Sequence, residues 1–156
     1  METVLYNHRN GQMVVSEGMI TSVCDIIHNM HPVLTKNSVS EINRELKQRL
    51  DIAGWVLDIK LDPSSKISIT GVSNGVGLCI QTGNISRIYA DLLKLQALYI
   101  NEKISAGIII APVSQSARIL GSNMANFDRI SKELPIFAQV ITTPIVVIGF
   151  DGTDVK

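Results

Sequence analysis

The sequence predicts an α/β fold in which a mixed sheet is flanked by helices. Three observations support this prediction. Two amphipathic helical patterns come first, three strand patterns with an Asn-Gly turn follow, and the last third alternates helices with short apolar strands. A hairpin followed by a crossover helix implies strands that pair first antiparallel and then parallel. No repeat or linker interrupts the chain, so one domain over residues 1–156 is expected.

Two helices are expected in the first third of the chain. Apolar residues recur at helical spacing over 17–30, and the pair His31-Pro32 ends that pattern. The second helix is expected to begin at Ser38, because Ser38 and Glu41 have the spacing of a capping box. Gly54 marks its end.

Three strands are expected next, at 55–61, 66–71 and 76–82. The dipeptide Asn74-Gly75 separates the last two and is a strong signal for a hairpin. It favours a type I′ turn, in which both central residues have positive φ. The two strands around it are therefore expected to pair antiparallel.

A two-residue turn also fixes which residues of the hairpin face each other. Thr70 is expected opposite Cys79, and Ile69 opposite Ile80. One face then gathers short polar or thiol groups and an amide, which makes it either a solvated surface or a site. The polar face consists of Ser68, Thr70, Cys79 and Gln81, and the apolar face of Ile67, Ile69, Leu78 and Ile80.

The rest of the chain alternates helices and buried strands. A helix is expected over 84–100, with Asn84 as its cap and an apolar stripe along one side. A short apolar strand follows at 106–111, then a helix at 126–134 and a last apolar strand at 145–150. Apolar strands of this kind are buried on both faces, as in parallel sheets.

Composition narrows the function classes. The chain is 46% hydrophobic and 18% charged with a net charge of zero, which excludes a disordered protein and any overall positive field. Nucleic-acid binding would need a local basic patch or a groove formed by a dimer. Cys24 and Cys79 have no histidine cluster near them in the sequence, so a zinc site is not expected. Two isolated cysteines are typical of a protein in a reducing cytoplasm, which is the expected location. The apolar runs are too short to cross a membrane, and the N-terminus lacks a secretory signal.

Two stretches resemble the BglII-type restriction endonucleases of the PD-(D/E)XK nuclease superfamily. The first runs from Asn74 to Tyr99, and its most specific part is Gly83-Asn84 after the strand that contains Gln81. The second covers residues 31–47 and Gly54-Trp55. The resemblance implies a core of order α-β-β-β-α-β, which agrees with the element order read from the sequence.

The resemblance also implies where catalytic groups would lie. Active members place an Asp at the end of the second strand and a Glu-x-Gln on the third, and the two carboxylates hold Mg²⁺. The glutamine matches Gln81, the Glu position falls on Cys79, and the Asp position falls on or beside Thr70. A thiol and a hydroxyl are uncharged at neutral pH and suit Mg²⁺ poorly. The resemblance thus implies the fold without the metal chemistry, and no cofactor is expected.

Other acids offer alternatives. Glu41 is either an auxiliary acid of the nuclease site or the third residue of its capping box, and the second interpretation is favoured. Asp58 and Asp62 are either relocated metal ligands or part of a solvated strand face, because they alternate with Lys60. The solvated strand face is the favoured interpretation.

A charged row follows on the 84–100 helix. Arg87, Asp91 and Lys94 recur at helical spacing and form either a surface salt-bridge ladder or a phosphate-binding row. Asn84, which matches the family's Gly-Asn, is a further candidate for binding. Cys79 as a nucleophile would need a base, and none is indicated.

Three functions remain open from the sequence. The favoured one is a homodimeric, nuclease-like protein that has lost metal-dependent cleavage and binds duplex DNA or another ligand. The second is an active Mg²⁺-dependent endonuclease that uses Asp58, Asp62, Glu41 or Asp91. The third is a protein that binds a nucleotide or small anion, which zero net charge favours over duplex DNA. The homodimer follows from the resemblance, and the apolar stripe of the 17–30 helix is the expected contributor to its interface.

Overall fold

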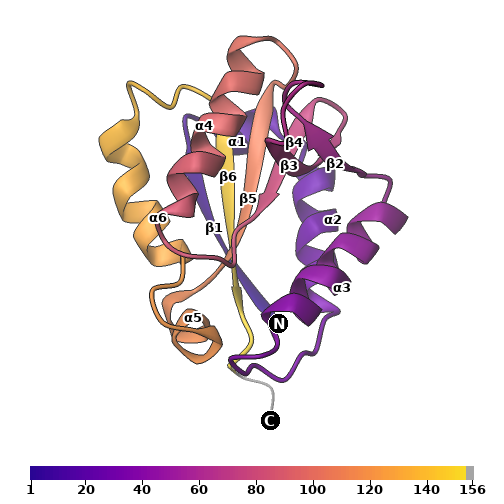
Figure 1. The fold of residues 1–156 in the computed structure, drawn as a ribbon, viewed down its shortest axis with the longest axis vertical. Coiled ribbons are helices and arrows are strands. Elements are labelled where there is room, and N and C mark those ends of the chain that lie inside the picture. The colour runs from indigo at the N-terminus through magenta and orange to yellow at the C-terminus, as the bar shows by residue number, and fades with distance from the viewer. Residues whose placement is uncertain (154–156) are drawn as a thin grey trace.

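The computed structural model describes residues 1–153 and is built around one six-stranded mixed sheet (Figure 1). The strand order is β1-β6-β5-β4-β3-β2. Strands β4, β5 and β6 pair parallel, and the other pairings are antiparallel. The strands are β1 (Glu2–His8), β2 (Val56–Lys60), β3 (Ser68–Ser73), β4 (Val76–Ile80), β5 (Ala106–Pro112) and β6 (Ile145–Asp151).

Helices cover both faces of the sheet and divide the core in two. The first core cluster packs α2 and α3 against one face, and the second packs α4 and α6 against the other. Neighbouring residues of β5 alternate between the clusters, with Ile108 in the first and Ile109 in the second. No helix within residues 1–153 is long and apolar enough to span a membrane. The helices are α1 (Gly11–Val14), α2 (Glu17–His28), α3 (Val39–Ile52), α4 (Arg87–Ile100), α5 (Ser114–Leu120), α6 (Phe127–Glu133) and the 3₁₀ helix η1 (Leu134–Phe137).

The sequence-based fold class is confirmed, and so is the predicted turn. Asn74 and Gly75 both have positive φ, 46° and 73°, as a type I′ turn requires. The hairpin is in the expected register where it pairs regularly, with Gly71 opposite Leu78. The expected parallel pairing of the apolar strands is also found.

Four elements were not predicted: β1, α1, α5 and η1. Strand β1 pairs with β6 at one edge of the sheet, and only His8 at its end is buried. An edge strand with neither face buried lacks the alternation of apolar and polar residues that identifies a strand. The short helices α1, α5 and η1 have four to seven residues, so a helical period is difficult to recognise in them, although the seven-residue α6 was predicted.

Ser38 lies at the predicted N-cap position of α3 but makes no capping bond with its side chain, and the predicted cap of α4, Asn84, is wrong. The Ser38 hydroxyl donates to the Thr35 carbonyl and accepts from the Thr35 N–H, so it does not cap α3. Helix α4 begins at Arg87 rather than at Asn84, and the Asn84 side chain instead accepts from the N–H of Ser86. Ser and Asn stabilise turns as readily as helix ends, and here the turns form.

The predicted apolar face of the hairpin is also wrong. Ile69 lies in the second core cluster together with Cys79, whereas Leu78 lies in the first. The cause is a face reversal at the edge, where Leu57 packs against the first cluster and Ile59 against the second. In a regular strand, Leu57 and Ile59 would share a face because they are two residues apart. Asp58, which lies between them, has φ 53°, and this departure from strand geometry places them on opposite faces.

The apolar stripe of α2 does not form a free surface. Val23 and Ile27 are fully buried in the first core cluster, and Met19 and Ile26 pack against that cluster. The pattern that suggested a contribution to a dimer interface is therefore the face that α2 turns toward the sheet.

Candidate functional site

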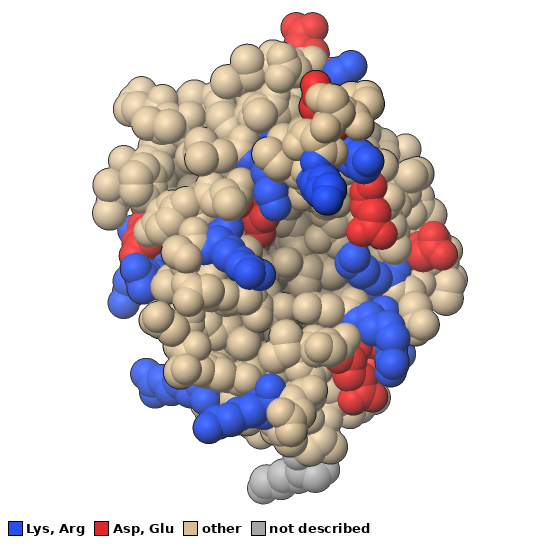
Figure 2. Space-filling view, viewed as in Figure 1, with Lys and Arg blue, Asp and Glu red and all other residues tan. Residues whose placement is uncertain are grey.

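A cleft of about 580 Å³ lies between α3, α4 and the strands β2, β3 and β4. Figure 2 shows a hollow in this face of the molecule, with Lys and Arg side chains around it. The cleft brings together most of the residues that the sequence singled out, although they come from four separate elements and the segment after β4. Those residues are Asp58, Thr70, Cys79, Gln81, Arg87, Asp91 and Lys94.

Gln81 is the centre of a buried polar network in the cleft. Its Nε2 donates to Oδ2 of Asp91 at 2.6 Å, and its Oε1 accepts from the N–H of Gly83 at 2.9 Å. The other carboxylate oxygen of Asp91, Oδ1, lies 3.1 Å from Nζ of Lys94. Burial raises the pKa of Asp91, while the charge of Lys94 opposes that rise. The segment after β4 and helix α4 are thus joined by a chain of polar contacts.

A second ion pair lies on the opposite side of the cleft. Nζ of Lys47, on α3, is 2.9 Å from Oδ1 of Asp58, on β2. Both side chains are largely exposed, so this pair is worth little to stability. It does mean that each aspartate of the cleft faces a lysine.

Cys79 belongs to the core as much as to the cleft. It is only 2% exposed and lies in the second core cluster with Leu92 and Leu95 of α4. Burial raises the pKa of its thiol, and the nearby charge of Asp91 raises it further. The thiol is therefore neutral at physiological pH, and a neutral thiol is neither a nucleophile nor a metal ligand.

The Thr70 hydroxyl is occupied by the backbone. Its Oγ1 accepts from the N–H of Ile80 at 3.0 Å, at the point where the regular pairing of β3 and β4 stops at Gly71 and Leu78. Thr70 thus continues the hairpin with a side-chain bond in place of a backbone one.

The cleft residues do not fit a magnesium ion. Mg²⁺ binds several oxygen ligands, ideally including one or two carboxylates whose charge is not already paired with a cation. Both oxygens of Asp91 are engaged by Gln81 and Lys94, Asp58 faces Lys47, and Cys79 offers a protonated sulfur. Within residues 1–153, no three or more His, Cys, Asp or Glu side chains are placed to hold a metal ion.

The charge of the cleft is positive although that of the chain is zero. Three cations and two carboxylates line it, which gives a formal charge of +1. Arg87 has no ion-pair partner among residues 1–153. A cleft of this kind attracts anions, and phosphates are the anions that arginine and lysine bind most readily.

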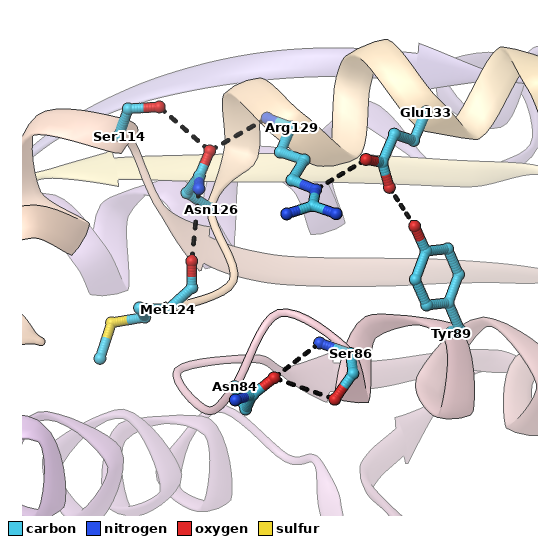
Figure 3. A network of polar contacts seen from close by, with 8 residues as sticks. All are labelled: Asn84, Ser86, Tyr89, Ser114, Met124, Asn126, Arg129 and Glu133. Carbon is cyan, nitrogen blue, oxygen red and sulfur yellow. Dashed lines mark hydrogen bonds and ion pairs between the residues drawn. The ribbon is translucent and has the colours of Figure 1, made fainter. Parts of the chain in front are cut away.

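The segment that follows Gln81 is fixed in place by a distant part of the chain. The Ala125 N–H donates to the Gly83 carbonyl, and the Ile85 N–H donates to the Asn123 carbonyl. Figure 3 shows how Asn126 holds its own end of this contact: its side chain accepts from the Ser114 hydroxyl and the Arg129 N–H and donates to the Met124 carbonyl.

Asn126 is the N-cap of α6, and further along this helix a polar contact joins α6 to α4. The Tyr89 hydroxyl, on α4, donates to the Glu133 carboxylate, which also pairs with Arg129 (Figure 3). The start of α4, which carries Arg87, is thereby held against the remainder of the fold.

Three of the sequence-based candidates do not line the cleft. Glu41 is exposed on α3, Asp62 is exposed and accepts from Ser64 in the turn after β2, and Asn84 is exposed in its own turn with Ser86. Metal binding by Asp62 and auxiliary acid chemistry by Glu41 therefore have no support from position.

The sequence reasoning missed the polar residues of α3 that form one wall of the cleft. Asn43 and Lys47 lie on α3, and the Asn43 side chain accepts from the hydroxyl of Thr82. Their spacing of four residues places them on one side of the helix, which was the available signal. The same spacing is common on solvent-facing helix surfaces, so it did not identify them.

A family model and two solved structures all relate this chain to BglII-type restriction endonucleases. Residues 3–150 match a family model described as Restriction endonuclease BglII/BglIII. The structure resembles BglII complexed with a DNA 16-mer, with a TM-score of 0.80 and 12% identity over 96% of this chain and 76% of that chain. It resembles free BglII with a TM-score of 0.77 and 12% identity, over 97% of this chain and 80% of that chain. No curated protein matches the sequence.

Proposed function

The chain belongs to the BglII/BglIII restriction endonuclease family, and from this premise we propose that it is a non-cleaving member that binds duplex DNA in its cleft without a metal ion. One observation carries the proposal: both aspartates of the cleft face lysines of the same cleft. Acids that are paired in this way offer less unbalanced negative charge to a divalent ion, which disfavours metal binding and the activation of water.

The loss of the metal chemistry also changes what the cleft attracts. The resemblance puts the family's two acids on Cys79 and on or beside Thr70, and on that correspondence two negative charges near a bound phosphate are absent. Each would have repelled the phosphate, most strongly in the buried part of the cleft where the effective dielectric is low. The formal charge of +1 and the cations Lys47, Arg87 and Lys94 favour phosphate binding in the absence of metal.

Two measurements test this proposal together. In a plasmid-nicking assay with Mg²⁺ or Mn²⁺, the wild-type chain is expected to leave the plasmid supercoiled. In fluorescence anisotropy with a labelled duplex of mixed sequence, it is expected to bind equally well with EDTA and with Mg²⁺, and more weakly as salt rises. Metal-dependent nicking that disappears in Asp58→Asn or Asp91→Asn would instead establish an active endonuclease with relocated acids.

A further control separates DNA from a small anion. Native mass spectrometry of the purified chain would reveal a retained nucleotide. Retention of such a ligand, together with no binding of duplex DNA at any salt concentration, would replace the DNA-binding proposal with a nucleotide-binding one.

We also propose that the chain acts as a homodimer. Support comes from an apolar patch on α4 and η1: Leu93 is 59% exposed and Ile136 75%. Tyr89, one helical turn before Leu93, packs edge-to-face on Phe137, which follows Ile136. Large apolar side chains gathered on one surface indicate an interface, and a second copy of the chain is the occupant that the patch is expected to meet.

Light scattering tests the dimer directly. The wild-type chain is expected to have twice the mass of one chain, and Leu93→Lys to have the mass of one chain. Ile52→Lys is the matched control, because Ile52 is also exposed, at 86%, but lies on α3 outside the patch. A monomeric wild-type chain at micromolar concentration would contradict the proposal.

A further inference from the structure

The ammonium group of Lys94 has a position in the cleft that no other cation shares. Its Nζ lies 3.1 Å from Oδ1 of Asp91, and its side chain is only 26% exposed. Lys47 is more exposed and pairs with an exposed aspartate, and Arg87 is exposed. Lys94 is therefore the cation of the cleft that the protein itself holds in place.

Asp91 is what fixes that position. Its side chain is 11% exposed, and Gln81 donates to the carboxylate oxygen that Lys94 does not reach. A buried carboxylate stays ionised only if hydrogen bonds and an opposite charge offset its loss of water. The pair is thus a built unit, in which Asp91 positions the ammonium and the ammonium keeps Asp91 charged.

We propose that Lys94 is the resident cation of this cleft and that its ammonium binds a phosphate of the DNA in place of a divalent metal ion. An ammonium has three donors, and Asp91 accepts from one of them. Two remain for phosphate oxygens in a cleft that Thr70, Gln81 and Arg87 also line. This inference rests on the proposed function, because the phosphate is that of the bound duplex.

The test compares the duplex affinity of Lys94→Met with that of the wild-type chain by anisotropy, over a range of salt concentrations. Affinity is expected to fall about tenfold at low salt, as for the loss of a charge-assisted contact. The slope of log affinity against log salt is expected to become shallower by about 0.9, the value for one phosphate contact. Loss of a merely structural residue would not change that slope by one contact.

Lys103→Met is the matched control, because Lys103 lies outside the cleft and is not expected to alter affinity or slope. Removing Lys94 leaves Asp91 buried without its partner, so the single variant loses stability. The double variant Lys94→Met/Asp91→Asn removes both charges and is expected to fold as well as the wild type while binding as weakly as Lys94→Met.

The outcomes distinguish this inference from the proposed function. A wild-type chain that binds no duplex would end the proposed function. A wild-type chain that binds, with the double variant binding equally tightly and with an unchanged salt slope, would overturn only the role of Lys94. Wild-type binding that requires Mg²⁺ would also overturn it, because the ammonium would then not have replaced the ion.

Discussion

The centre and the edge of the sheet differ in almost every respect. Every residue of β5 and all but the last of β6 are buried, whereas β2 has no buried residue. The central strands pair in unbroken parallel ladders, while β2 and β3 reverse their faces at Asp58. The cleft lies between these regions, on the edge side of β4.

This difference separates the part of the molecule that stabilises the fold from the part that lines the cleft. The burial that stabilises the fold is concentrated in β5, β6 and the helices that cover them, and none of those strands lines the cleft. Substitutions on the cleft side of β2 and β3 therefore change chemistry at little cost in stability. The predictions below test that division.

The largest effect is expected at the centre. Ile148→Ala, in β6, removes a fully buried side chain and is expected to lower the free energy of unfolding by about 2–5 kcal/mol. Ile59→Ala, in β2, removes a half-buried one and is expected to cost about 1 kcal/mol. Urea unfolding of both variants measures the contrast. Equal costs would show that the edge contributes as much as the centre.

Cys79 tests the boundary between core and cleft. Cys79→Ala is expected to lower the free energy of unfolding by about 1–2 kcal/mol, because it leaves a void among buried side chains, and to leave duplex affinity unchanged. In the folded wild type, the thiol is expected to resist alkylation until urea unfolds the chain, as mass spectrometry can follow. Rapid native labelling of Cys79 would place it on the accessible side of the boundary.

A smaller, pH-dependent effect on stability is expected at His8, which ends β1 at the opposite edge of the sheet from β2. Burial lowers the pKa of its ring, whose Nε2 lies 2.7 Å from the Ile141 carbonyl and donates to it. The unfolded chain takes up a proton near pH 6.5, while the folded chain resists it. Stability is therefore full above pH 6.5 and falls as the pH drops through the lowered pKa. His8→Gln is expected to remove this acid sensitivity in thermal unfolding, and an unchanged pH profile would contradict it.

The smallest effect is expected at Asp58 itself. Its φ of 53° is unfavourable for most side chains and free for glycine. Asp58→Gly is expected to raise the free energy of unfolding by up to about 1 kcal/mol, because the exposed pair with Lys47 contributes little. Asp58→Val is expected to lower it, since a β-branched residue tolerates positive φ worst. If both variants lose stability equally, the backbone conformation is not what distinguishes them.

Much of the fold was predictable because its signals are local. The Asn74-Gly75 turn and the apolar strand at 106–111 each depend on chemistry visible within a few residues. Strand β1 was not predictable, since it is recognised only by its pairing with β6, which is about 140 residues away. The face reversal was invisible for a related reason: an aspartate at positive φ in a strand is fixed by tertiary packing.

The candidate site was predictable in part of its membership but not in its arrangement. Alignment with the family motif identified Thr70, Cys79 and Gln81, and all three line one cleft. Helical spacing grouped Arg87, Asp91 and Lys94, yet it could not show that Asp91 turns inward to Gln81. Such inward contacts depend on how α4 lies on the sheet, a distance between elements that no local pattern encodes.

The reversal at Asp58 also bears on how this chain avoids aggregation. Strand β2 is an open edge of the sheet, where unpaired backbone groups could accept a strand from another molecule. A straight incoming strand can match Val56–Leu57 or Ile59–Lys60, but not both, because the side chains change sides between them. Exposed charges at Asp58 and Lys60 add to this mismatch. The face reversal at Asp58, which lines the cleft, therefore also disfavours edge-to-edge pairing of the sheet with another molecule.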